Sequence, residues 1–164
     1  MKTNFFITVT LLCILGCTSK QSDQLTQQQK EQIKKEVRVF ADNVFKAWES
    51  LDLDKTLSFY SQDMVKVGDS TLQDFQAYKK AGIDFLSIVD SVKFTEDRWE
   101  CIVLSKNLVL AYWSGKAEWF IKSGKIFIND PNIYTNIIKK ENGQWKVIYE
   151  QFIGIPVTQQ AEQK

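Results

Sequence analysis

Histidine is absent from this chain of 164 residues. It is the usual general base of Ser-His-Asp and Cys-His systems and a common ligand of zinc and non-haem iron. Glycine is also scarce, and its seven residues are scattered singly, so the chain has no glycine-rich phosphate-binding loop. These absences exclude the common nucleophilic hydrolases and histidine-ligated metal enzymes. We therefore expect no metal site and no cofactor.

Excess charge of either sign is also lacking. The chain has 21 basic and 20 acidic residues, and no basic run. This balance argues against a nucleic-acid footprint, so we expect no nucleic-acid partner. The length suits one domain with a sizeable core.

A hydrophobic run long enough to span a bilayer is missing too. The apolar segment Phe5–Leu15 has roughly half of the ~20 residues that a spanning helix needs. Because it follows the positive start Met1-Lys2, we interpret residues 1–16 as a signal peptide.

The signal ends in Ile14-Leu15-Gly16-Cys17, which resembles the lipobox of bacterial lipoproteins. The resemblance implies that Cys17 receives lipid, such as palmitate, and becomes the first residue after cleavage. Thr18 is not the aspartate that retains such proteins in the inner membrane of some bacteria. We therefore expect a protein of the bacterial cell envelope, anchored to a membrane by its N-terminal lipid, with the outer membrane favoured. The alternative is a plain secretion signal with an incidental cysteine.

The rest of the chain divides by composition. Residues 17–32 are polar and glutamine-rich, which is typical of a tether. Residues 33–155 carry the periodic patterns of a folded domain, and residues 156–164 read as a disordered tail. Cys101 has no remaining partner for a disulfide, and we expect it to be a small buried hydrophobic residue.

Helices are predicted in the first half of the domain. An apolar stripe at helical spacing begins at Ile33 and ends near Leu51. Asp52 is placed to cap a short second helix that contains Leu57 and Tyr60, and Thr71 to cap a third.

Strands are predicted in the second half. Residues 108–121 alternate with period two, and one face of this segment is wholly apolar. Residues 122–132 carry turn signals and read as a long loop, in which Ile126-Phe127-Ile128 could pair briefly with a neighbouring strand. A hairpin that turns at Asn142-Gly143 follows. Helices followed by a meander of strands indicate an α+β fold.

The order of these elements resembles the nuclear transport factor 2-like superfamily, and most closely its bacterial SnoaL-like branch. The residues that carry the resemblance are the step Asp52-Leu53-Asp54 into Leu57, Tyr60 and Asp63, and the closing turn Asn142-Gly143-Gln144-Trp145-Lys146-Val147. The resemblance implies a cystatin-like cone in which three N-terminal helices pack on a curved antiparallel sheet. The superfamily includes isomerases, cyclases and dehydratases, but also non-catalytic binding and dimerisation domains, so the fold does not determine function.

The two groups that the steroid isomerases of this superfamily use are missing in register. Counting from the Asp52-Leu53-Asp54 step, Gly68 falls on the position of the aspartate base and Val44 on that of the tyrosine. A one-residue slip would bring Asp69 to the base position, but such a slip in a strand turns the side chain to the other face.

Five residues are candidates for lining a pocket: Tyr60, Trp113, Trp119, Tyr134 and Glu150. Glu150 lies between Ile148 and Phe152 on a face that looks buried, where a carboxylate could act as acid or base. The alternative is that Glu150 faces solvent or pairs with Lys139. Tyr60 and the tryptophans have the alternative of being core residues.

The sequence therefore favours a membrane-anchored, non-catalytic domain that binds a small apolar ligand or a protein partner. The alternative is an enzyme of isomerase or dehydratase type that uses Asp69 or Glu150 as a pocket carboxylate together with Tyr60. A third hypothesis is a homodimer that forms through Leu108, Leu110 and Tyr112 on the outer face of the sheet.

Overall fold

The computed structural model describes residues 24–68 and 71–157. The signal peptide, Cys17, Asp69 and most of the predicted tail lie outside the described residues. The elements, in chain order, are α1 (Gln27–Glu49), α2 (Leu53–Leu57), β1 (Tyr60–Gly68), β2 (Thr71–Asp74), α3 (Phe75–Leu86), β3 (Val89–Ser105), β4 (Leu108–Ile121), β5 (Ile126–Glu141) and β6 (Gln144–Pro156).

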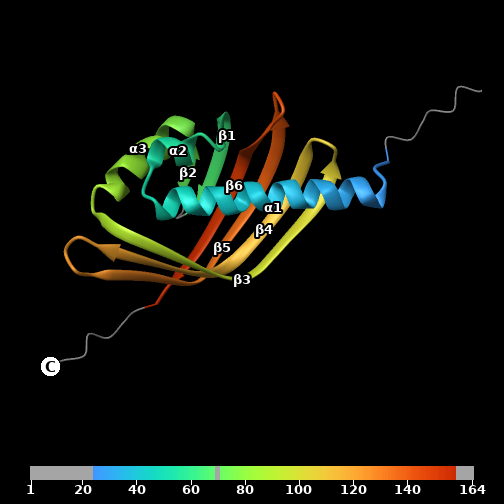
Figure 1. Cartoon of the computed structure of the whole chain (residues 1–164). Coiled ribbons are helices and arrows are strands. Elements are labelled where there is room, and N and C mark those ends of the chain that lie inside the picture. Colours follow the sequence, from blue (N-terminus) through green and yellow to red (C-terminus); the bar gives the residue numbers. More distant parts are fainter. Residues whose placement is uncertain (1–23, 69–70, 158–164) are drawn as a thin grey trace, which may run out of the picture.

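Helix α1 begins earlier than the apolar stripe that predicts it. Thr26 and Gln29 form a capping box, in which each side chain accepts a hydrogen bond from the backbone N–H of the other residue. The end of the polar segment 17–32 is therefore helical from Gln27 onward. Ile33 and Val37 of the predicted stripe are buried as expected, and α1 lies along the face of the sheet (Figure 1).

Two predictions near α2 and α3 are wrong. Tyr60 is not part of the second helix, because α2 ends at Leu57 and Tyr60 is the first residue of β1. The cap of α3 is Asp74, whose carboxylate accepts a hydrogen bond from the N–H of Ala77 at 2.8 Å. Thr71 cannot be this cap because it pairs with Gly68 in the β1–β2 ladder.

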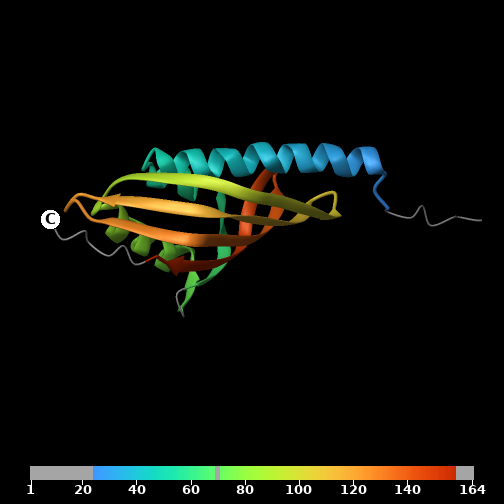
Figure 2. The ribbon, with the colours of Figure 1, turned by 90° about the horizontal axis from the view of Figure 1, so that it is seen from below.

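The fold is α+β, with six strands in the order β2-β1-β6-β5-β4-β3. The expectation of a wholly antiparallel sheet is wrong at one pair, because β1 and β6 run parallel. The described residues form three helices, and α3 follows the first two strands instead of preceding the sheet. Figure 2 shows α1 over one face of the curved sheet.

The predicted loop at residues 122–132 is mostly strand. The chain turns only between Ile121 and Ile126, and β5 then pairs with both β4 and β6. Both ladders shift register between Asn129 and Asn132, which leaves Pro131 outside the regular pairing. Proline lacks the N–H that a ladder needs, so a bulge is where a central strand can accommodate it.

Strand β4 confirms the alternation predicted from its sequence. Its odd-numbered residues from Val109 to Ile121 are all buried, and the even-numbered ones are half-buried on the other face. The buried face packs under the helices in two clusters, one around Val37, Phe40 and Val109 and one around Trp119. None of the helices in the described ranges has the length and apolar character required to cross a membrane.

Candidate functional site

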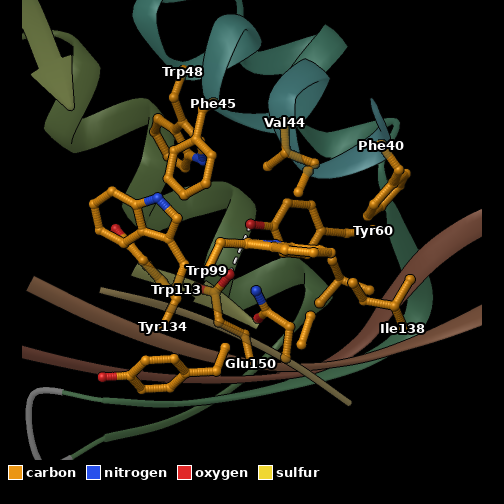
Figure 3. A pocket seen from close by; sticks show the side chains of 15 residues that line it. Phe40, Val44, Phe45, Trp48, Tyr60, Trp99, Trp113, Tyr134, Ile138 and Glu150 are labelled. Carbon is orange, nitrogen blue, oxygen red and sulfur yellow. Dashed lines mark hydrogen bonds between the residues drawn. The ribbon is translucent and has the colours of Figure 1, made fainter. Parts of the chain in front are cut away.

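Two hollows lie between the helices and the inner face of the sheet. The outer cavity has a volume of about 610 Å³, and its walls come from α3, the β4–β5 hairpin and the end of β6. The inner cavity has a volume of about 40 Å³ and lies under α1 (Figure 3). Trp48, Tyr134 and Glu150 line both, so these three residues form the boundary between the two cavities.

A bulge in β6 turns Glu150 toward this boundary. Val147 pairs with Ile138 and Tyr149 with Ile137, so β6 has one residue more than β5 in this interval. The inward face of β6 therefore changes from Trp145 and Val147 to Glu150, which is only 2% exposed. The predicted buried face is correct at Glu150, although Val147 and not Ile148 precedes Glu150 on it.

Hydrogen bonds hold one oxygen of the Glu150 carboxylate. The Tyr60 hydroxyl donates to Glu150 Oε2 at 2.8 Å, and the Tyr78 hydroxyl donates to Tyr60 Oη at 3.2 Å. The alternative in which Glu150 faces solvent or pairs with Lys139 is wrong, because Glu150 is buried and its ion-pair partner is Lys66. Lys139 Nζ instead lies 3.7 Å from Glu141 Oε1.

Burial raises the pKa values of the Tyr60 and Tyr78 phenols well above 10, and the nearby negative charge of Glu150 adds to the effect. Tyr60 and Tyr78 are therefore neutral hydrogen-bond donors at physiological pH. They position the carboxylate and are poorly suited to releasing a proton.

The second carboxylate oxygen faces a lysine. Lys66 Nζ lies 3.3 Å from Glu150 Oε1, and the two residues are direct partners in the parallel β1–β6 ladder. This contact lacks hydrogen-bond geometry, so Oε1 is a buried acceptor to which no described residue donates. The Lys66 ammonium also lies 4.8 Å from the ring centroid of Tyr78 and 5.4 Å from that of Phe152, within the range of cation–π attraction.

The predicted aromatic residues lie at different depths. Trp113 lines the inner cavity, where it packs against Phe45 at 4.8 Å and Tyr134 at 5.8 Å between ring centroids. Trp119 lines the outer cavity, where Phe85 packs on it at 4.9 Å. Four of the predicted residues thus meet at the inner cavity (Figure 3): Tyr60, Trp113, Tyr134 and Glu150. Trp119 lines only the outer cavity.

Sequence reasoning missed Lys66, Tyr78 and Asn136. Tyr78 belongs to the apolar stripe of α3, which gave a signal for burial but none for its hydrogen bond. Asn136 faces Glu150 across the β5–β6 ladder and lines the inner cavity. Lys66 gave no signal, because only the unexpected parallel pairing places it beside Glu150.

The residues of the site could bind a ligand or accept a proton from one. Its walls are largely apolar, and the buried carboxylate of Glu150 lies beside the ammonium group of Lys66. Such a pair can orient a polar ligand group, or accept a proton while the ammonium stabilises developing negative charge. Within residues 24–68 and 71–157 no three histidine, cysteine, aspartate or glutamate side chains gather as a metal site would require.

No family model matches the chain, and no curated protein matches its sequence. Solved structures do match its shape. A protein provisionally assigned as a scytalone dehydratase from Novosphingobium aromaticivorans superposes with a TM-score of 0.73 at 10% identity, over 79% of this chain and 89% of that chain.

Two further structures agree. The hexachlorocyclohexane dehydrochlorinase LinA Type2 superposes with a TM-score of 0.68 at 8% identity, over 81% of this chain and 94% of that chain. An NTF2-like protein of unknown function from Pseudomonas putida KT2440 superposes with a TM-score of 0.62 at 17% identity, over 74% of this chain and 86% of that chain. The chain therefore has the nuclear transport factor 2-like fold; identities this low show the fold alone.

Proposed function

We propose that the chain is a binding domain for a small, largely apolar molecule held in the outer cavity. The observation that carries this proposal is the cavity itself, with a volume of about 610 Å³ between α3 and the sheet. Ligand pockets in proteins typically measure roughly 300–1,000 Å³ and combine apolar walls with a few polar groups. Here Phe85, Trp119 and Phe152 supply the apolar walls, and Lys66 and Glu150 supply the polar end.

Tryptophan fluorescence tests the proposal, because Trp48 and Trp119 both line the outer cavity. A panel of small aromatic and alicyclic molecules should change the emission of the full chain in a saturable way. Ala81→Phe fills the cavity from α3 and should abolish this response, whereas Ala77→Phe changes an exposed position of the same helix and should preserve it. An equal response of the two variants would contradict binding in this cavity.

The second candidate function is an enzyme that abstracts a proton from carbon. The observation that favours it is the buried carboxylate of Glu150 at the outer cavity, whose Oε1 lies 3.3 Å from the Lys66 ammonium and receives no hydrogen bond from a described residue. In this scheme Oε1 accepts the proton while Lys66 stabilises the negative charge that develops on an adjacent carbonyl oxygen. Two solved structures with this fold carry the names of a dehydrochlorinase and, provisionally, a dehydratase.

Deuterium exchange tests the enzyme candidate. Cyclic ketones in deuterium oxide should exchange their α-protons faster with the wild-type chain than with Glu150→Gln, as followed by nuclear magnetic resonance. Glu118→Gln, which removes one carboxylate from the opposite face of the sheet, should retain the wild-type rate. Exchange no faster than in buffer for every ketone tested would eliminate this candidate.

We also propose that the domain is held at the bacterial outer membrane through lipid on Cys17. The support is the sequence Ile14-Leu15-Gly16-Cys17 after a short apolar run. Labelled palmitate should be incorporated into the wild type and Cys13→Ser but not into Cys17→Ser, and membrane fractionation should place the labelled protein in the outer membrane. Equal labelling of the two cysteine variants would refute the anchor.

A further inference from the structure

We propose that Lys66 and Gln73 form a two-donor subsite in the outer cavity, and that the ligand is an apolar molecule without net charge that presents a carbonyl oxygen to them. The inference rests on the proposed function, because it names the class of molecule that the outer cavity takes and the residues that recognise it. It concerns recognition and holds for a ligand that is bound without reacting.

The first argument is which charged group a ligand in the outer cavity meets. Lys66 lines the outer cavity but not the inner one. The Lys66 side chain is 18% exposed, whereas the Glu150 side chain is 3% exposed and its Oε1 is buried. A ligand therefore meets the ammonium group of this ion pair and not the carboxylate, and the polar group that suits an ammonium is a hydrogen-bond acceptor.

The second argument is the number of donors on Lys66. An ammonium group has three N–H donors, and Glu150 Oε1, 3.3 Å from Nζ, can engage one of them. The rings of Tyr78 and Phe152, with centroids 4.8 Å and 5.4 Å from Nζ, attract the positive charge as a whole and do not accept as an oxygen atom does. Lys66 can therefore donate to a ligand oxygen while its ion pair with Glu150 stays in place.

The third argument is a second donor beside the first. Gln73 is the direct partner of Lys66 in the antiparallel β1–β2 ladder, so the two side chains share one face of the sheet, with Cβ atoms roughly 4.5–5.5 Å apart. Gln73 also lines the outer cavity. A carbonyl oxygen has two lone pairs, so it can accept from the Lys66 ammonium and the Gln73 amide at once.

The fourth argument is net charge. Among the described residues that line the outer cavity, only Lys66 and Glu150 are charged, and together they are neutral. A ligand carboxylate at Lys66 would add an excess negative charge to a largely apolar cavity, and a ligand cation would meet the ammonium directly. Burial of an uncompensated charge is unfavourable, so the subsite favours a neutral acceptor.

Equilibrium dialysis of the full chain tests the inference with four probes that share a naphthalene ring and carry side groups of similar shape: 2-acetylnaphthalene, 2-isopropenylnaphthalene, 2-naphthoate and 2-naphthamidinium. The ketone should bind about tenfold or more tighter than the alkene, the anion and the cation, because only the ketone offers a neutral acceptor.

Variants assign the preference to the two residues. Lys66→Met and Gln73→Leu should each reduce the preference for the ketone over the alkene. Lys116→Met removes one ammonium group from the opposite face of the sheet and should leave the preference unchanged.

The outcomes separate this inference from the proposed function. Equal binding of the ketone and the alkene would leave the apolar cavity intact and overturn the carbonyl subsite, as would tightest binding of the anion or the cation. A ketone preference that survives Lys66→Met or Gln73→Leu would overturn the role of that residue. Failure of every probe to bind would overturn both proposals. Gln73 lies on the edge strand β2, so Gln73→Leu and the wild-type comparison decide the matter even if Lys66→Met does not fold.

Discussion

At the scale of single residues, the chain carries a carboxylate that is almost fully enclosed. Burying such a group is unfavourable unless it receives hydrogen bonds or a counter-charge. Glu150 has both, from the Tyr60 hydroxyl at 2.8 Å and the Lys66 ammonium at 3.3 Å. The hydrogen bond from the Tyr60 hydroxyl therefore contributes to the stability of the fold by satisfying the buried carboxylate.

Replacing Tyr60 by phenylalanine should therefore reduce stability. Tyr60→Phe removes the donor to Glu150 Oε2 and leaves that buried oxygen without a partner, at a cost of about 1–3 kcal/mol. Urea unfolding should show this loss. Tyr112→Phe, on the outer face of β4, is the control and should change stability by less than about 0.5 kcal/mol. Equal midpoints for the two variants would contradict the structural role of the hydrogen bond.

The phenols also predict a response to alkaline pH. Because the pKa values of Tyr60 and Tyr78 are raised above 10 in the folded chain, the unfolded chain loses these protons first as pH rises. The stability that the neutral phenols contribute is present below pH 10 and is lost above it.

Urea unfolding at several pH values measures this effect. The free energy of unfolding of the wild type should fall above pH 10, and it should fall less steeply in Tyr78→Phe, which has one such phenol fewer. Identical slopes for the two proteins would show that Tyr78 does not contribute.

At the scale of the elements, strands β3 and β4 approach each other unusually closely at Gly115. A Cβ atom on Gly115 would overlap the backbone oxygen of Thr95 and contact the Trp113 ring. The ladder shifts register beside this point, between Glu96 and Arg98. The glycine lets the two strands meet at the bulge.

Gly115→Ala should therefore destabilise the chain by roughly 1–3 kcal/mol or more, because neither backbone can move away without breaking the ladder. Gly124→Ala, in the β4–β5 turn, is the control. Its position has a φ of +86° but open space around it, so only the backbone penalty of about 1–2 kcal/mol applies. Thermal unfolding followed by circular dichroism compares the two, and a smaller loss in Gly115→Ala would contradict the close approach.

The elements also show which parts of the fold could be predicted from the sequence and which could not. The alternation of residues 108–121 and the Asn142-Gly143 turn, where both residues have positive φ, could be predicted because their causes are local. The strand role of Tyr60 and the pairing of residues 126–132 could not, because they depend on neighbours far away in the chain.

The same division holds for the site. Glu150 could be singled out because it is a charged residue within an apolar strand. Its partner Lys66 could not, since the parallel β1–β6 ladder joins segments that carry no mutual signal. The sequence also could not show how deep each tryptophan lies. The positions of Trp113 and Trp119 in the strand do not reveal that one lines the inner cavity and the other the outer cavity.

At the scale of the whole molecule, the outer face of the sheet carries an apolar row. In register across five strands lie Val65, Tyr149, Ile137, Leu110 and Ile102. Ile102 is 56% exposed, and none of the three helices in the described part of the chain covers this face (Figure 2). We propose that two copies of the chain associate through this row, which includes Leu110 of the predicted dimer surface.

Light scattering tests this association. The wild type should have the mass of a dimer, and Leu110→Lys, which places a charge in the row, should have that of a monomer. Val39→Lys is the control, because Val39 is exposed on α1 and not on the sheet. A wild type that remains monomeric at high concentration would refute the dimer.

The position of β6 has a consequence for the order in which the molecule forms. β6 comes last along the chain among the strands, yet it lies in the middle of the sheet between β1 and β5. Tyr60 and Glu150, which meet there, are 90 residues apart. Contacts at such separation form slowly because a long loop must first close. Until β6 has inserted between them, β1 and β5 each have an edge without a partner, and the outer cavity lacks the wall that β6 supplies.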